Sequence, residues 1–285
     1  MKFVFFGSSR FSVYVLEELA KAGLTPFLIV SLPPSPKGRG LKVSSNIVTN
    51  WAKAHHLPCL EPQKLDSAFL STLSAKSCTL FLVASYGKII PKNILDIPEH
   101  GTLNLHPSLL PKYRGPSPIQ TQILRDEKEV GVTIMLADEK TDHGPIVSSC
   151  KLQASSFKLW PTKSQELERE LARVGGRLLA ETIPKWISGK IKSAPQDHDK
   201  ATYTKKLSKK DGEIDSSADP YQNFLRIQAM AEWPGAHFFA EKGEEKIRVK
   251  ITDASFENEK LIIKKVVPEG RKEMSYDEFL RGFKN

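Results

Sequence analysis

Three side chains in the sequence are of types that can move a proton and bind a developing negative charge. Asn104 and His106 are two residues apart, and Pro107 follows them. Side chains two apart in a strand point to the same face, so the amide and the imidazole would leave one strand end together. Proline cannot donate to a central ladder, which predicts that the strand stops at Pro107. The pair offers a hydrogen-bond donor and a titratable nitrogen at one place.

A carboxylate completes the set at Asp142, between strand-like runs at 132–136 and 146–147. It could orient the imidazole or accept a proton. The three groups suit transfer of an acyl or formyl group to an amine, because the carbonyl oxygen needs a donor as it becomes an oxyanion and the amine must lose a proton. The alternative is that His106 is only a hydrogen-bonded structural group at a strand end.

The elements that would position these residues have the pattern of an α/β sheet. An apolar run at 3–6 is followed by a helical pattern at 11–19 and an apolar strand at 27–31. This order predicts a parallel sheet. The turn between the first strand and the helix lacks the three glycines of a dinucleotide site. We expect further strands at 79–85, 101–106, 131–137 and 145–152, and helices at 46–56 and 164–179.

Composition limits the class of protein. With 285 residues, 40% hydrophobic and 26% charged, the chain fits an ordinary globular protein of two domains. No apolar run approaches the roughly 18 residues of a membrane span. The three cysteines form neither a metal motif nor a disulfide framework, so we expect core cysteines in a reducing cytoplasm and no metal. We also expect a monomer. The net charge of +9 favours a polyanionic partner, although some basic proteins bind no nucleic acid.

The stretch Asn-Leu-His-Pro-Ser-Leu-Leu-Pro at 104–111, together with Asp142, resembles the folate-dependent formyltransferases. The resemblance covers nearly the whole chain. It implies an open, mostly parallel, Rossmann-like α/β sheet that binds 10-formyltetrahydrofolate as formyl donor. Asn104 and protonated His106 would then hydrogen-bond the oxyanion. Asp142 would hold His106 and help the amine proton to leave.

The resemblance also predicts where folate binds. One segment follows the strand at 79–85 and is similar to the family's segment around the pterin ring, where backbone groups make most contacts. A plain strand-to-helix turn would explain its glycine equally well. The other segment follows His106 and is similar to a folate-contacting turn. The predicted folate residues are Tyr86, Gly87, Lys88, Ile89, Ser108, Leu109, Leu110 and Pro111.

A basic loop at 31–42 separates branches of the family. Its three prolines and two glycines predict no regular structure. It resembles a loop that enters the acceptor arm in members acting on initiator methionyl-tRNA, and that amino-sugar enzymes generally lack. A lysine-rich stretch at 205–210 would follow the tRNA backbone, although both segments also suit a solvated surface. The expected tRNA contacts are Lys37, Arg39, Lys42, Lys205, Lys206, Lys209 and Lys210.

We divide the chain into a catalytic domain at 1–192, a linker at 193–204 and a C-terminal domain at 205–285 that resembles a reduced OB-like β-barrel. The function this implies is formylation of the α-amino group of initiator methionyl-tRNA for translation initiation. An N-formyltransferase for an amino-sugar nucleotide is the alternative, favoured by the short second domain and opposed by the basic loop. A tRNA-binding module without catalysis is a third reading, opposed by the intact Asn104, His106 and Asp142.

Overall fold

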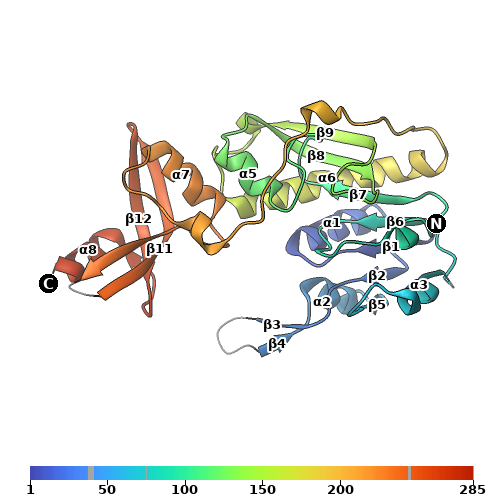
Figure 1. Ribbon diagram of the computed structural model, residues 1–285, viewed down its shortest axis with the longest axis horizontal. Helices are drawn as coiled ribbons and strands as arrows, with labels where there is room; N and C mark the ends of the chain where they lie inside the picture. Colours follow the sequence, from blue (N-terminus) through green and yellow to red (C-terminus); the bar gives the residue numbers. More distant parts are fainter. Residues whose placement is uncertain (38–41, 75, 243–244, 285) are drawn as a thin grey trace. The chain divides into compact units, whose positions relative to one another are not determined.

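The computed structural model describes residues 1–37, 42–74, 76–242 and 245–284. A seven-stranded sheet runs in the order β5-β2-β1-β6-β7-β8-β9 (Figure 1). Pairing is parallel from β5 to β7 and antiparallel between β7 and β8. The predicted open, mostly parallel sheet is therefore confirmed. Its strands are β1 Phe3–Phe6, β2 Leu28–Val30, β5 Cys59–Leu60, β6 Leu80–Val83, β7 Thr102–His106, β8 Glu129–Leu136 and β9 Ile146–Gln153.

The first two helices begin at residues whose side chains cap them. Ser9 caps α1 in a capping box with Ser12, and the Asn46 side chain accepts from the backbone of Val48 at the start of α2. The predicted helices at 46–56 and 164–179 are present as α2 and α6. The helices are α1 Arg10–Lys21, α2 Ile47–Ala54, α3 Ser67–Ser74, α4 Lys92–Leu95, α5 Pro118–Leu124, α6 Ser164–Ile187, α7 Pro220–Ala229 and α8 Tyr276–Lys284.

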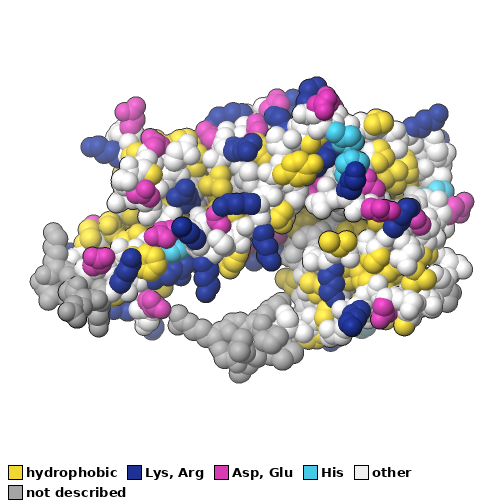
Figure 2. All heavy atoms as spheres, in the orientation of Figure 1, with side chains coloured by type: hydrophobic (Ala, Val, Ile, Leu, Met, Phe, Trp, Pro, Cys, Tyr) yellow, Lys and Arg dark blue, Asp and Glu magenta, His cyan; other side chains and the backbone are white. Residues whose placement is uncertain are grey.

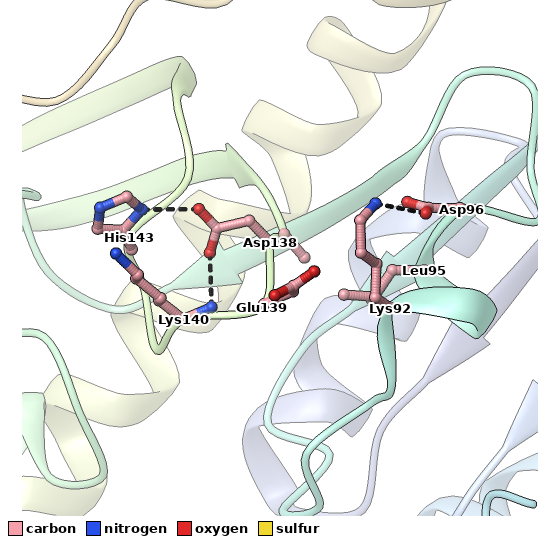
Figure 3. Close-up of a pocket in the computed structure, with 8 residues that line it drawn as sticks. Lys92, Leu95, Asp96, Asp138, Glu139, Lys140 and His143 are labelled. Atoms are coloured by element: carbon pink, nitrogen blue, oxygen red, sulfur yellow. Dashed lines mark hydrogen bonds and ion pairs between the residues drawn. The ribbon is translucent and has the colours of Figure 1, made fainter.

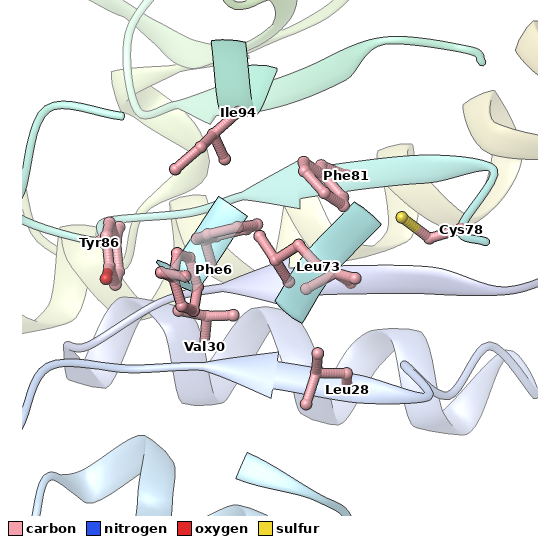
Figure 4. Packing of buried hydrophobic residues seen from close by; sticks show 10 residues of the cluster. Phe6, Leu28, Val30, Leu73, Cys78, Phe81, Tyr86 and Ile94 are labelled. Carbon is pink, nitrogen blue, oxygen red and sulfur yellow. The ribbon is translucent and has the colours of Figure 1, made fainter. Parts of the chain in front are cut away.

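One face of the sheet is covered by α3 and α4. Figure 4 shows Phe6 of β1 beside Val30 of β2 and Phe81 of β6, with Leu73 of α3 and Ile94 of α4 packed against them. The rings of Phe6 and Phe81 lie 5.2 Å apart. Each of these side chains is fully buried, so this cluster fixes β1, β2 and β6. The first predicted folate segment follows the carboxyl end of β6.

Helix α6 packs against β7 and α1 through two adjacent glycines. A Cβ atom at Gly175 would lie 2.5 Å from Leu105 in β7, and one at Gly176 would lie 2.6 Å from Glu18 in α1. Only glycine allows so close an approach. Because Leu105 faces α6, the alternation of a strand sends Asn104 to the other face of the sheet.

The segment at 31–42 contains regular structure, and the prediction that it has none is wrong. Strand β3 (Ser35–Lys37) pairs antiparallel with β4 (Lys42–Ser44), with Pro36 opposite Val43. Both strands of a two-stranded sheet are edges, where a proline can sit without breaking a ladder on its free side. The stretch at 38–41, which includes Arg39, lies outside the described residues.

The chain divides into two compact units. The first contains the seven-stranded sheet and comprises Met1–Arg114, Gly131–Lys151 and Glu168–Tyr203. The second comprises Gly115–Val130, Leu152–Leu167 and Thr204–Asn285. It therefore includes two segments that the sequence assigned to the catalytic domain, and the domain boundaries at 192 and 204 stay a prediction.

The second unit contains a small antiparallel sheet in the order β10-β11-β12-β13. Helices α7 and α8 pack on its strand β12. Among the described residues the sheet has four strands, fewer than the five of a complete OB barrel, so the domain is reduced as expected. The strands are β10 His237–Lys242, β11 Glu245–Glu257, β12 Lys260–Pro268 and β13 Met274–Ser275.

Candidate active site

The structure brings Asn104, His106 and Asp142 together at the carboxyl end of β7. Nδ2 of Asn104 donates to Oδ1 of Asp142 at 3.5 Å, and Nδ1 of His106 lies 3.4 Å from the same oxygen. Charge-assisted contacts are usually about 2.7–2.9 Å. Contacts in catalytic sites without substrate are often this long and tighten when the complex forms. The carboxylate therefore faces an amide and an imidazole at one point, as the sequence spacing predicted.

The imidazole of His106 lies between two oxygen atoms. Its Nε2 bonds the backbone oxygen of Tyr113 at 2.9 Å, while Nδ1 faces Asp142. Nε2 needs a hydrogen to bond the Tyr113 oxygen, and this contact sets which side of the ring faces Asp142. The side chain is 5% exposed, which holds this orientation.

Asp142 is held in an unusual backbone conformation. Its φ angle is 50°, in the left-handed region that Asp and Asn tolerate better than most residues. The turn around it is tight. A Cβ atom at Gly144 would lie 1.9 Å from the backbone oxygen of Leu136, and the Leu136 backbone N–H donates to Pro145 at 2.9 Å. The ends of β8 and β9 thus fix the loop that carries the carboxylate.

A hollow of about 260 Å³ lies between α4 and the loop that leads to Asp142 (Figure 3). On one side Asp138 accepts from the Lys140 backbone and bonds His143 Nδ1 at 2.7 Å. On the other side Lys92 pairs with Asp96 at 2.5 Å. Sequence reasoning missed this hollow because only the fold brings α4 to the loop. Its lining is Lys92, Leu95, Asp96, Ala137, Asp138, Glu139, Lys140 and His143.

In the first predicted folate segment, the Tyr86 and Lys88 side chains are engaged within the protein. Tyr86 is 2% exposed and packs edge-on against Phe6, and its hydroxyl has no partner among the described residues. Burial raises the pKa of Tyr86 to about 12. Lys88 donates to backbone oxygens at 62 and 63, whereas Ile89 is 87% exposed. Gly87 has a φ angle of 86°, which requires glycine.

A serine and an asparagine side chain anchor this segment to its neighbours. The Ser8 hydroxyl donates to the backbone oxygen of Tyr86 at 2.6 Å. In turn, Nδ2 of Asn46 donates to the backbone oxygen of Ser8 at 2.9 Å, while Oδ1 of Asn46 caps α2. Asn46 thus joins the end of the β3–β4 hairpin to the turn after β1, and Ser8 joins that turn to the segment after β6.

The second predicted folate segment is shaped by Thr133 of β8, which sequence reasoning missed. The Thr133 hydroxyl donates to the backbone oxygen of Ser108 at 2.7 Å and accepts from the backbone of Leu110 at 3.0 Å. The Ser108 hydroxyl donates to the backbone of Lys112 at 2.7 Å. Leu109 packs on Gly131, and the peptide bond before Pro111 is cis. Thr133 pairs with His106 in the sheet. This register is visible only in the folded structure, so nothing in the sequence indicated the role of Thr133.

The predicted tRNA residues are divided between the two units. Lys205, Lys206, Lys209 and Lys210 are exposed on the second unit, where Lys205 pairs with Asp211. Strands β3 and β4 end at Lys37 and begin at Lys42, respectively. Figure 2 shows Lys and Arg side chains spread over the visible face with acidic side chains between them.

No helix in the described ranges is long and apolar enough to cross a membrane. The same part of the chain contains no group of three or more His, Cys, Asp or Glu side chains placed to hold a metal ion.

The sequence matches a family over most of the first unit. Residues 1–183 match the family described as formyl transferase, so the chain belongs to the formyl transferases. Its relatives include the methionyl-tRNA formyltransferase of Chloroflexus aurantiacus, 42% identical over 84% of this chain and 76% of the relative. A methionyl-tRNA formyltransferase of Thermus thermophilus is 37% identical over 95% of this chain and 86% of the relative. The resemblance inferred from the Asn104–Pro111 stretch is confirmed.

Solved structures share the fold. A methionyl-tRNA formyltransferase from Clostridium thermocellum matches with a TM-score of 0.62 and 17% identity, covering 94% of this chain and 98% of that chain. A sugar N-formyltransferase from Shewanella matches with a TM-score of 0.64 and 15% identity, covering 88% and 96%. Structural likeness alone therefore does not separate the two acceptors.

Proposed function

We propose that this protein transfers the formyl group of 10-formyltetrahydrofolate to the α-amino group of initiator methionyl-tRNA. The observation that carries the chemistry is the meeting of Asn104 and His106 at one oxygen of Asp142. The relatives with 37–42% identity, which are methionyl-tRNA formyltransferases, carry the choice of acceptor.

The chain supplies a donor, an orienting group and a proton acceptor. The α-amino nitrogen would attack the formyl carbon of the bound donor, and the bond between that carbon and N10 of the folate would break. Tetrahydrofolate would then leave, with N10 taking up the proton that Asp142 accepted from the amine. Nδ2 of Asn104 carries two hydrogens and has one long contact to Asp142, so it donates to the formyl oxygen as negative charge develops there. Nδ1–H of His106, whose contact to Asp142 is also long, is shared between the carboxylate and the same formyl oxygen. The carboxylate of Asp142 holds the His106 ring against Tyr113 and takes up the amine proton, directly or through a water molecule.

The folate would lie between the segments after β6 and β7 and the hollow beside α4. Backbone groups of 86–89 are the available contacts, because the Tyr86 side chain is buried in the core. The hollow of about 260 Å³ is smaller than the roughly 300–1,000 Å³ of pockets for whole drug-sized ligands, so it suits one ring system of the donor, the pterin. Ser108 to Pro111 would contact the rest of the molecule.

The tRNA would be bound by cations through its phosphates. We assign this role to the basic loop at 37–42 and to the exposed lysines at 205–210, with the protein acting as a monomer. The pairing of Lys205 with Asp211 reduces the charge that this lysine offers to a phosphate, so Lys206, Lys209 and Lys210 carry more of the contact.

An amino-sugar nucleotide remains the competing acceptor, favoured by the small second sheet, which has four strands among the described residues. One assay separates the two. Purified protein is given 10-formyltetrahydrofolate with charged initiator tRNA or with an amino-sugar nucleotide, and formylated product is measured. We expect formylmethionyl-tRNA. Efficient formylation of the sugar with none of the tRNA would reverse the assignment.

A further inference from the structure

A buried glutamine outside the trio connects to the loop that carries the carboxylate. Gln196 lies in the segment that follows α6 and is 5% exposed. Its Nε2 donates to the backbone oxygens of Asp142 at 3.0 Å and Gly144 at 2.7 Å. Its Oε1 accepts from Nη2 of Arg114 at 2.6 Å and from Nε at 3.2 Å. One amide group thus uses both its donor and its acceptor ends.

Arg114 holds the Gln196 amide, and it directly follows Tyr113, whose backbone contacts the His106 imidazole. Arg114 is 1% exposed, and Tyr113 before it supplies the backbone oxygen that accepts from His106. Thr202 fixes both backbone N–H groups: its hydroxyl accepts from Tyr113 at 2.8 Å and its carbonyl accepts from Arg114 at 2.9 Å. Nη2 of Arg114 also donates to Nδ1 of His198 at 2.9 Å.

The two oxygens that flank the His106 ring therefore belong to segments joined by the Arg114–Gln196 pair. On one side the ring meets the backbone of Tyr113, and on the other it meets Asp142. Asp142 has a left-handed backbone conformation, which persists only when its surroundings determine it. The amide of Gln196 supplies that restraint through the Asp142 carbonyl.

We propose that Gln196 and Arg114 are positioning residues for formyl transfer, and that the segment at 195–203 is part of the catalytic site. This rests on the proposed function. The Arg114–Gln196 pair sets the distance between the Tyr113 oxygen and the Asp142 carboxylate. It thereby sets the orientation of the His106 ring, which lies between them. Displacement of reacting groups by about 1 Å can cost roughly 100-fold in rate.

Two substitutions separate positioning from simple burial. Gln196→Glu keeps an acceptor for Arg114 and removes the Nε2 donor. Gln196→Met keeps the size of the side chain and removes both the donor and the acceptor. Gln122→Met is the matched control, because Gln122 is a 1% exposed glutamine that donates to a backbone oxygen, that of Pro118 in α5. For each variant, kcat, the KM for each substrate and thermal unfolding are measured. The ring ¹⁵N signals of His106, identified by their loss in His106→Asn, are recorded as well.

We expect kcat to fall about 10- to 100-fold in both Gln196 variants, with the KM for the formyl donor changed less than about twofold. The Gln122 variant should keep its kcat at a similar loss of melting temperature. The His106 ring signals should move in the Gln196 variants only. Wild-type kcat in Gln196→Glu, or a rate loss no larger than the unfolded fraction, would overturn the proposal.

The ring signals keep the two proposals apart. If the wild-type protein formylates neither acceptor, the proposed function fails, but a His106 signal that moves in Gln196→Met and not in Gln122→Met still supports the positioning role. If the His106 signal moves in neither Gln196→Met nor Gln122→Met, Gln196 does not position the ring, whichever acceptor the protein uses.

Discussion

At the scale of single residues, the amide of Asn104 is the donor most open to a reacting oxygen. Both nitrogens of His106 face protein oxygens, while Nδ2 of Asn104 has a long contact of 3.5 Å to Asp142. Asn104→Ala should therefore lower kcat by roughly 100- to 1000-fold, as for loss of one oxyanion donor. Folate binding, measured by fluorescence titration, should be retained. Turnover within a few fold of wild type would remove Asn104 from the mechanism.

The charge of Asp142 can be removed without changing its backbone. Asparagine tolerates the left-handed conformation that Asp142 has at φ 50°, so Asp142→Asn should fold normally. We expect kcat to drop by about two orders of magnitude or more, because the variant can neither balance a protonated His106 nor take up a proton. Melting temperature should change by only a few degrees. A variant that unfolds while its folded fraction stays active would assign Asp142 a structural role alone.

At the scale of elements, α6 controls the strand that carries the site. Gly175→Ala would place a Cβ atom 2.5 Å from Leu105, which lies between Asn104 and His106. Overpacking of this kind costs about 1–3 kcal/mol and outweighs the roughly 1 kcal/mol that alanine gains over glycine in a helix. We expect lower stability in urea unfolding together with lower kcat. Gly282→Ala in α8, with no described atom within 4 Å of the added carbon, is the control and should not destabilise.

The short turn η3 (Lys209–Gly212) should show a pH-dependent contribution to stability. Hydrogen bonds from Lys205 and then Ser208 lower the pKa of Asp211 to about 2, from 3.8. Ionised Asp211 therefore stabilises the fold above about pH 4, and this is lost as the pH falls towards 2. Asp211→Asn should cost about 1 kcal/mol at pH 7, since Lys205 is largely exposed. Urea unfolding should give a smaller difference at pH 3; an equal difference at both values would contradict the assignment.

At the scale of the whole molecule, recognition of tRNA should depend more on the basic loop at 37–42 than on Lys205, which is already paired with Asp211. Arg39 is flanked by glycines, whereas Lys205 shares its charge with Asp211. Arg39→Ala should lower kcat/KM for charged initiator tRNA more than Lys205→Ala does. It should also reduce the slope against log salt by about one. The measurement is kcat/KM across a salt series. A collapse in the Lys205 variant beside an unchanged Arg39 variant would assign recognition to the second unit.

Local pattern was enough to predict the sheet and the shared strand end of Asn104 and His106. Apolar runs closed by Gly or Pro marked β1, β6 and β7, and period-two alternation put Asn104 and His106 on one face. The hairpin of β3 and β4 was missed because prolines were read as excluding strands, although an edge strand accepts them.

The supports of the trio could not be predicted in the same way. The bonds from Gln196 to the Asp142 loop join residues 54 and 52 positions apart, and no local periodicity encodes such a pair. Likewise, the hollow beside α4 exists only because α4 meets the loop after β8 in the fold. Residue types and spacing thus indicated Asn104, His106 and Asp142 as candidates for the chemistry, while long-range packing decides what holds them.

The position of Asn46 has a consequence for how this protein could change its acceptor over evolutionary time. Asn46 follows the hairpin of β3 and β4, caps α2 and bonds the turn after β1. The two hairpin strands therefore precede the residue that attaches this segment to the sheet. Insertions, deletions or whole exchanges of this hairpin would leave Asn46 and the catalytic sheet intact. If this hairpin contacts the acceptor as we propose, the choice of acceptor could diverge among descendants while the formyl-transfer chemistry stays constant.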